Sequence, residues 1–214
     1  AGAVPYALRG APLVANGMVL QGVTATMIPE GGFIVGLDLD TGDEMWRFQT
    51  VARPDEPGGN TWNNLDLADR SGGSVWVPAS YDPELDLAYY GTAPTYDTAP
   101  LLHSLNEEDV SNDALYTNAT IALRPKTGEL VWYFQHMPND QWDLDWVFER
   151  QIVELQVDGA LRKVIVTAGK MALYDALDAE TGKYLSSFDV GIQNIVTAID
   201  PDTCHLSTSD SADG

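Results

Sequence analysis

Residues 36–46 read GLDLDTGDEMW, and this stretch decides the fold because similar stretches recur along the chain. Residues 122–132 read ALRPKTGELVW, residues 176–186 read ALDAETGKYLS, and residues 198–204 form a shortened copy, AIDPDTC. In the repeat one strand is expected to end, Thr-Gly to form a tight turn, and the next strand to begin, with the Trp of the first two copies flat between neighbouring sheets. A unit that repeats in this way buries its faces only against its neighbours. The repeat therefore predicts an all-β fold of the β-propeller class.

Short strands with turn residues between them support this prediction. Asn16-Gly17 within residues 13–20 and Asp158-Gly159 within residues 152–168 are the strongest hairpin signals. Further strands are expected at residues 32–39, 44–51, 74–81, 85–92, 117–124, 130–135 and 171–178. Residues 96–112 are the least strand-like stretch and are expected to form a long excursion.

Composition excludes several classes of protein. The chain has 214 residues, 44% of them hydrophobic, so it can bury a core. Its net charge of −21 disfavours binding to nucleic acid or to an anionic membrane surface. A single cysteine, Cys204, excludes internal disulfides and multi-cysteine metal sites. No run reaches the ~18 apolar residues expected of a membrane-spanning helix.

Three further blocks give the chain a family resemblance. Residues 72–76 read GGSVW and are followed by Tyr-Asp-Pro at 81–83, then by YYGT at 89–92, and residues 138–145 read PNDQWDLD. With the repeat, these blocks resemble the pyrroloquinoline quinone (PQQ)-dependent alcohol dehydrogenases, the quinoprotein family of methanol and ethanol dehydrogenases. The resemblance covers roughly residues 10–200.

The resemblance implies an incomplete propeller. Family members have eight blades, whereas 214 residues suffice for about four or five blades of about 40–45 residues. We therefore expect a central fragment in which residues 1–199 form the partial propeller. Residues 200–214 are expected to be a disordered or truncated tail.

The resemblance also assigns roles to five residues. Asp143 matches the catalytic base, Trp76 the aromatic floor beneath PQQ, and Lys170 the cation beside the quinone carbonyls. Ser74 and Thr92 fall where hydroxyls can bond the cofactor. By residue type alone, the same positions also fit a packing tryptophan, a turn-capping aspartate and a solvated lysine; the surrounding motifs favour the cofactor roles.

The resemblance also implies a metal ion, Ca²⁺ or a lanthanide, although not all of the family's ligand positions carry suitable donors here. Asp143 and Asp145 are the expected ligands, and an acid two residues after the base marks the lanthanide-dependent branch of the family. Two other family ligand positions fall on Met27 and Pro94, which offer poor donors to a hard cation. Two nearby acids could substitute for them, Glu30 and Asp97.

The function implied is oxidation of a small alcohol to an aldehyde by base-assisted hydride transfer to PQQ. The resemblance further implies a periplasmic location and a cytochrome c electron acceptor for the parent protein, and open propeller edges favour self-association. The alternative is a non-catalytic propeller that acts as a scaffold or protein-interaction module. It accounts for the repeats and the missing metal ligands, but not for the GGSVW and WDLD blocks together.

Overall fold

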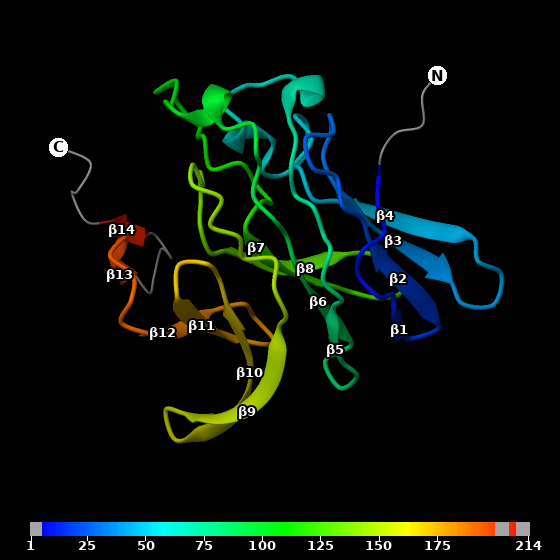
Figure 1. Ribbon diagram of the computed structural model, residues 1–214. Helices are drawn as coiled ribbons and strands as arrows, with labels where there is room; N and C mark the ends of the chain where they lie inside the picture. Colours follow the sequence, from blue (N-terminus) through cyan, green and yellow to red (C-terminus); the bar gives the residue numbers. More distant parts are fainter. Residues whose placement is uncertain (1–5, 200–205, 209–214) are drawn as a thin grey trace.

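The chain folds into consecutive antiparallel sheets that follow one another around an arc (Figure 1). The computed structural model describes residues 6–199 and 206–208. Three sheets have four strands, and a fourth has two. The strands are β1 Leu13–Ala15, β2 Met18–Gly22, β3 Phe33–Asp38, β4 Glu44–Gln49, β5 Ser80–Asp82, β6 Leu87–Gly91, β7 Ala119–Leu123, β8 Leu130–Gln135, β9 Gln151–Val157, β10 Ala160–Ala168, β11 Leu173–Asp178, β12 Tyr184–Asp189, β13 Val196–Ile199 and β14 Leu206–Thr208.

The predicted all-β fold class is confirmed, and each four-stranded sheet is one blade. The described residues hold three such blades rather than the four or five expected from length, because residues 50–79 and 92–118 are used in long connections. The predicted tail, residues 200–214, lies outside the described residues except for β14, which pairs with β13.

Both predicted hairpins form. Asn16 and Gly17 have φ of 48° and 74°, as do Asp158 and Gly159 at 50° and 80°, the left-handed values that a tight two-residue hairpin turn requires. The strand expected at residues 74–81 is corrected: only Ser80–Asp82 is a strand. Residues 74–79 instead run as a connection because their backbone bonds to other connections.

The repeated stretches form the last two strands of each blade and the turn between them. In all three copies the pairing register shifts at the same place, between the first and second residues of the repeated stretch. The tryptophan of one copy lies on the turn of the next blade: Trp46 Nε1 donates to the Pro125 carbonyl at 2.9 Å, and Trp132 Nε1 donates to the Ala179 carbonyl at 3.1 Å. The predicted packing of tryptophan between sheets is confirmed.

Glycine in the turn is required by this contact. A Cβ on Gly128 would lie 2.5 Å from the Trp46 ring, and one on Gly182 would lie 2.5 Å from the Trp132 ring. Both glycines also have a φ of 72°. The third copy has Ser186 at the tryptophan position, so the third blade presents no indole to whatever follows it.

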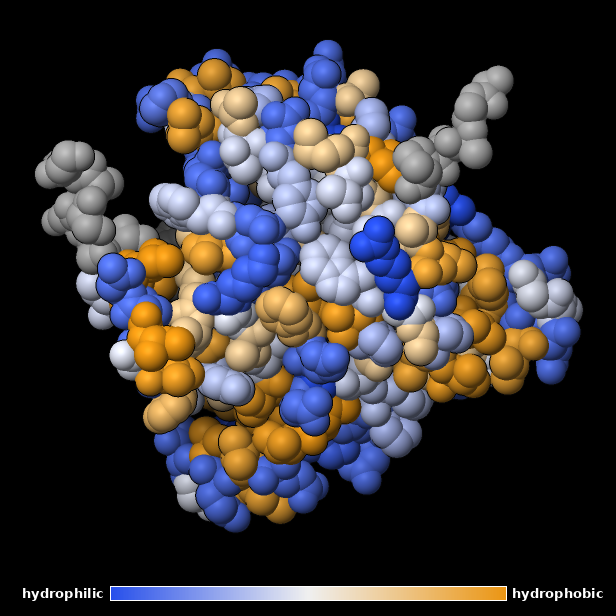
Figure 2. Space-filling model, viewed as in Figure 1, coloured by the Kyte–Doolittle hydropathy of each residue, from blue (hydrophilic) through white to orange (hydrophobic). Residues whose placement is uncertain are grey.

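The core is divided among the blade interfaces. One cluster lies between the first and second blades and includes Leu20, Ile34 and Ile121. A second lies between the second and third blades and includes Trp132 and Leu177. The outer surface of the first and third blades carries exposed apolar side chains among polar ones (Figure 2), including Val14, Met45, Leu161 and Phe188.

The connections contain three short 3-10 helices, Gly59–Thr61, Leu67–Asp69 and Ala99–Leu101. Residues 96–112 form no strand, as predicted. Within the described ranges, no helix is long and apolar enough to cross a membrane.

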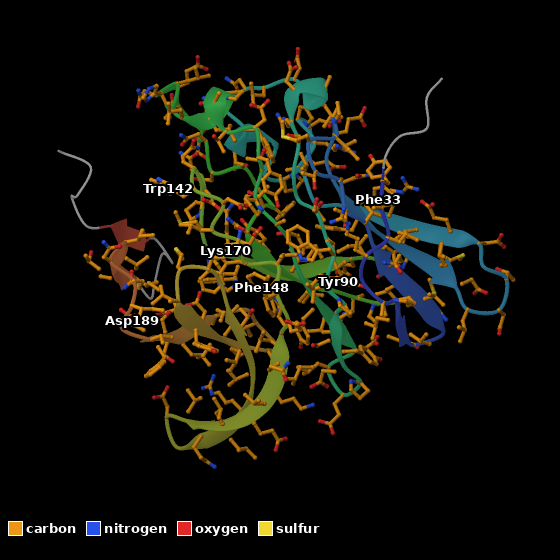
Figure 3. The ribbon with its side chains drawn as sticks, viewed as in Figure 1. Phe33, Tyr90, Trp142, Phe148, Lys170 and Asp189 are labelled. Atoms are coloured by element: carbon orange, nitrogen blue, oxygen red, sulfur yellow. The ribbon has the colours of Figure 1, made fainter. Side chains whose placement is uncertain are left out.

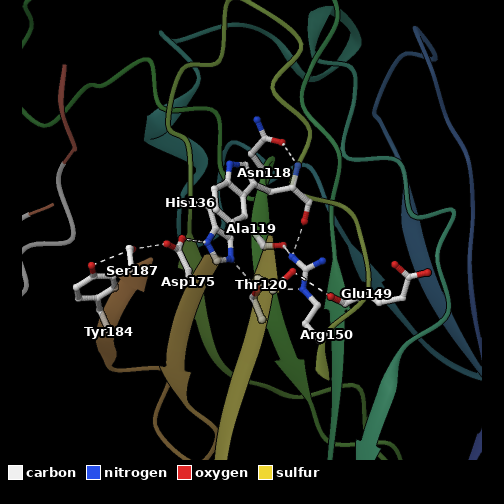
Figure 4. A network of polar contacts seen from close by, with 11 residues as sticks. Asn118, Ala119, Thr120, His136, Glu149, Arg150, Asp175, Tyr184 and Ser187 are labelled. Atoms are coloured by element: carbon white, nitrogen blue, oxygen red, sulfur yellow. Dashed lines mark hydrogen bonds and ion pairs between the residues drawn. The ribbon is translucent and has the colours of Figure 1, made fainter. Parts of the chain in front are cut away.

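A buried polar network joins the second and third blades (Figure 4). His136 Nδ1 lies 2.6 Å from Asp175 Oδ2, and its Nε2 lies 2.8 Å from the Thr120 hydroxyl, which also accepts a bond from Arg150 Nε at 3.1 Å. Ser187 extends the chain by donating to Asp175 Oδ1 at 2.5 Å, and it accepts from the Tyr184 hydroxyl at 2.9 Å. Burial lowers the pKa of His136 more than Asp175 raises it, so the imidazole is neutral at pH 7.

Trp132→Ala is expected to destabilise the fold by about 3–5 kcal/mol, because the indole is 7% exposed and fills the interface between two blades. Urea unfolding followed by circular dichroism measures this. Trp142→Ala is the matched control, since that side chain is 63% exposed. Equal losses for the two variants would contradict the role given to Trp132.

His136 is expected to make stability fall with acidification. Its folded pKa lies below the ordinary 6.5, so the unfolded state binds the proton more readily. Its contribution is complete above about pH 6.5 and is lost as the pH falls toward the folded value, at up to about 1.4 kcal/mol per pH unit. Urea unfolding between about pH 7 and pH 5 should show this slope in the wild type and in a His103→Gln control, but not in His136→Gln. An unchanged slope in His136→Gln would assign the effect elsewhere.

Candidate functional site

Three connections of the first and second blades meet beside one another. Val75 N donates to the Val23 carbonyl at 2.8 Å, which joins the segment before β5 to the segment after β2. Ala93 N donates to the Ser74 carbonyl at 2.9 Å, which joins it to the segment after β6. The GGSVW block therefore lies between two other connections rather than in a sheet.

The two glycines of this block are needed because its backbone lies very close to neighbouring segments. Gly72 has a φ of 104°, and a Cβ there would lie 2.5 Å from Thr95 Cα. On the other side, Val75 is buried against Gly22, whose Cβ would lie 2.3 Å from the Val75 side chain. Trp76 follows and is half-buried. The block thus presents Trp76 on a tightly held backbone.

Ser74 and Thr92 are both 0% exposed, and their hydroxyls bond to the backbone. Ser74 Oγ accepts from Ala25 N at 2.8 Å. Thr92 Oγ1 donates to the Tyr116 carbonyl at 2.6 Å and accepts from Ala119 N at 2.9 Å. These bonds give both hydroxyls a structural task, and their predicted bonding to PQQ stays a prediction.

The structure brings together Asp143, Asp145 and Lys170, which the sequence separates by up to 27 residues. Lys170 Nζ lies 2.9 Å from Asp143 Oδ2 and 2.5 Å from Asp145 Oδ2, and it also donates to the Asp143 carbonyl at 2.9 Å. The Asp143 side chain is 54% exposed, whereas that of Asp145 is 7% exposed. In the view of Figure 3, Lys170 and Trp142 both lie above the sheet of strands β9–β12. We call Asp143, Asp145 and Lys170 the acid–lysine cluster.

Electrostatics in this cluster follow from burial. Burial raises the pKa of Asp145, although Lys170 opposes the shift. Partial burial opposes protonation of Lys170, but its bonds to Asp145 and Asp143 outweigh this and raise its pKa. Burial also raises the pKa of Tyr96, and the charges of Asp145 and Asp143 add to the effect. Tyr96 therefore faces the cluster.

Buried polar atoms without a partner indicate where a polar ligand fits. The hydroxyls of Thr24 and Thr95 are buried and make no hydrogen bond within the protein. Thr24 precedes the residue bonded to Ser74, and Thr95 contacts Gly72, so the two hydroxyls flank the GGSVW block. Such atoms normally find a partner. Together with the half-buried Trp76, they fit a planar cofactor rich in carbonyl and carboxylate oxygens, which describes PQQ.

The residues do not complete a metal site. Among the described residues, no group of three or more His, Cys, Asp or Glu side chains is arranged to hold a metal ion. Met27 is 56% exposed with a φ of 55°, and the buried Pro94 uses its carbonyl to accept from Gly73 N at 3.4 Å. Lys170 lies where a cation between Asp143 and Asp145 would lie. The ammonium group therefore supplies the positive charge there.

The sequence assigns no role to three residues that lie beside the cluster: Tyr96, Asn118 and Asp140. Tyr96 lies in the excursion that carried no motif. Asp140 belongs to the PNDQWDLD block, and its position two residues before Trp142 is the usual signal for an aspartate that caps a turn. Asn118 has no local signal, because its partners are 22 and 28 residues away.

Comparison with known proteins identifies the family of this chain. A profile described as "Glucose/ethanol/alcohol dehydrogenase, beta-propeller domain", a PQQ family, matches residues 3–191. Among curated proteins, the chain is 35% identical over 201 residues to quinohemoprotein alcohol dehydrogenase ADH IIB of Pseudomonas putida, which covers 88% of this chain and 28% of the relative. It is 32% identical over 213 residues to the dehydrogenase subunit of the quinone alcohol dehydrogenase of Komagataeibacter europaeus, covering 92% and 28%.

Solved structures agree. The quinohemoprotein alcohol dehydrogenase ADHIIG of Pseudomonas putida superposes with a TM-score of 0.82 at 31% identity, covering 95% of this chain and 31% of that one. A europium-containing methanol dehydrogenase superposes with a TM-score of 0.84 at 25% identity, covering 95% and 37%. This chain thus spans under a third of the length of the curated relatives described above. The family resemblance predicted from the motif blocks is confirmed, and the chain belongs to the PQQ-dependent alcohol dehydrogenase family, of whose β-propeller it forms a part.

Proposed function

We propose that this chain is the segment of a PQQ-dependent alcohol dehydrogenase that carries the catalytic base and part of the cofactor site. The observation that carries the proposal is the acid–lysine cluster, in which a predicted base and a predicted cation from separate segments are in contact. A scaffold would need no such cluster. Because the chain spans only part of its relatives, the complete reaction is proposed for the full-length protein.

Asp143 is the residue suited to take the proton of the alcohol. Its carboxylate is about half exposed, so a substrate hydroxyl can reach it, and Lys170 holds one of its oxygens at 2.9 Å. A carboxylate in this position can accept a proton from a substrate hydroxyl. Asp145 is buried and shares the same ammonium, so it holds Lys170 in place.

Trp76, with the hydroxyls of Thr24 and Thr95, is the part of this chain suited to hold the cofactor. The half-buried indole offers an aromatic face, and the two unpartnered hydroxyls offer hydrogen-bond donors on either side of the GGSVW block. When bound, PQQ supplies the two-electron acceptor for hydride. Lys170 would place positive charge near the oxygens that become electron-rich.

The proposal extends to partners and location. The substrate class is a small alcohol, in keeping with the names of the relatives. The names of several relatives combine a quinone with a haem, which supports a cytochrome c as electron acceptor for the parent. We also propose a periplasmic location and self-association of the isolated chain through its exposed apolar surface.

Asp143→Asn in the full-length protein is expected to lower kcat by ~10²–10⁴-fold while PQQ stays bound, because the amide keeps the shape but accepts no proton. Steady-state alcohol oxidation and the absorbance of bound quinone measure the two effects. Asp158→Asn, in the β9–β10 turn, is the control. Wild-type turnover by Asp143→Asn would remove Asp143 from the mechanism and favour the scaffold alternative.

Lys170→Ala is expected to convert the cluster into a cation site. Removing the ammonium leaves two carboxylates that repel each other and attract a hard trivalent ion. Tryptophan-sensitised terbium luminescence should report binding at least about tenfold tighter than in the wild-type chain, equivalent to about 1.4 kcal/mol. Lys126→Ala removes the same charge from an exposed position and is the control. Equal terbium affinities in the two variants would show that Lys170 does not fill a cation position.

A further inference from the structure

We propose that Asp140 and Asn118 are positioning residues that fix the backbone carrying Asp143 and Asp145. This inference rests on the proposed function, since it concerns how the proposed base is held. Neither residue contacts the ammonium of Lys170. Both act through the main chain of residues 142–146, which we call the acid loop.

Asp140 holds the first half of the acid loop. It is 3% exposed, and its Oδ1 accepts from Trp142 N at 2.8 Å. Its Oδ2 accepts from Leu144 N at 2.7 Å and from Asn118 Nδ2 at 2.8 Å. One buried carboxylate therefore binds two backbone amides of the loop and the side chain that holds its second half.

Asn118 holds the second half. Its side chain is 0% exposed, and its Oδ1 accepts from Trp146 N at 3.2 Å. Its backbone carbonyl accepts from His136 N at 2.9 Å, which anchors it to the end of β8. The Trp146 ring in turn stacks on His136, with centroids 4.3 Å apart and planes 4° apart. Asp140 and Asn118, which we call the clamp, therefore rest on the buried network between two blades.

The clamp and the cluster use alternate residues of the acid loop. The amides of Trp142, Leu144 and Trp146 are bound by Asp140 and Asn118. The carboxylates of Asp143 and Asp145 reach Lys170. Fixing every second amide thus fixes the two carboxylates between them, with the ammonium as the meeting point.

Asp143 needs such support because its backbone is in a disfavoured conformation. Its φ is 60°, in the left-handed region that L-residues other than glycine seldom adopt. The bonds to Trp142 N and Leu144 N lie on either side of it. Without them the loop can relax, and the proposed base would leave its place beside Lys170.

Asp140→Asn tests the clamp, because the amide keeps the volume but loses one of the two acceptor oxygens. In the full-length protein we expect kcat to fall by roughly 10–100-fold with little change in the KM for alcohol, as for a displaced catalytic group. By hydrogen exchange, the amides of Trp142 and Leu144 should exchange at least about tenfold faster, a readout that does not depend on activity. Asp178→Asn is the matched control, since Asp178 caps the backbone amides of Glu180 and Thr181 in a turn of the third blade.

Asn118→Gly is the second variant and keeps the test decisive if Asp140→Asn folds poorly. Asn118 has a φ of 47°, which glycine accepts, so the substitution removes only the side chain. We expect faster exchange at Trp146 N and a similar fall in kcat.

The outcomes separate the two proposals. A loosened loop with wild-type kcat, unchanged exchange at the clamped amides, or an equal kcat loss in Asp178→Asn would each overturn the positioning role. Full turnover by Asp143→Asn would overturn the proposed function itself, whatever Asp140→Asn does. Loss of kcat together with faster exchange confined to the acid loop would support both.

Discussion

The arrangement of the blades depends on one contact, an indole laid on the Thr-Gly turn of the next blade. Trp46 does this against Gly128, and Trp132 does it against Gly182. Each contact needs a residue without a Cβ, a positive φ and a carbonyl to receive the indole N–H, so few other arrangements satisfy it. Because it fixes each sheet against its neighbour, it also fixes where the connections leaving those sheets meet. The site is made of those connections.

The chain is strongly acidic, and two of its few cationic side chains each pair with two carboxylates. Lys163 joins two blades by pairing with Asp82 and Glu84, and Lys170 joins Asp143 to Asp145. Two neighbouring carboxylates repel each other, and one is buried, so the ammonium lets both remain close. The ion pair that stabilises the loop therefore also holds the carboxylate of the proposed base in place.

The buried network and the proposed site share the interface between the second and third blades. His136 and Asp175 are buried there, and the His136 ring supports Trp146, next to the buried Asp145. Arg150 lies in the same region, and burial lowers its pKa to about 9. It donates to the carbonyls of Trp146 and Ala119, so a charged group stabilises the end of the acid loop by bonding its backbone. A rigid interface is what allows a strained residue such as Asp143 to keep one position.

The sequence by itself determined the blade unit, because strand, turn and tryptophan lie within eleven residues and are governed by local rules of turn chemistry and packing. It also pointed to Asp143 and Trp76 through short motifs, and to Lys170 through the family resemblance. Only the tertiary structure decided that residues 74–79 form a connection rather than a strand, and that the hydroxyls of Ser74 and Thr92 bond to the backbone. It alone showed that Lys170 contacts both Asp143 and Asp145, and that Asn118 reaches Asp140. These depend on contacts between residues 19 to 52 positions apart, and such contacts are set by how the blades stack, which no local pattern records.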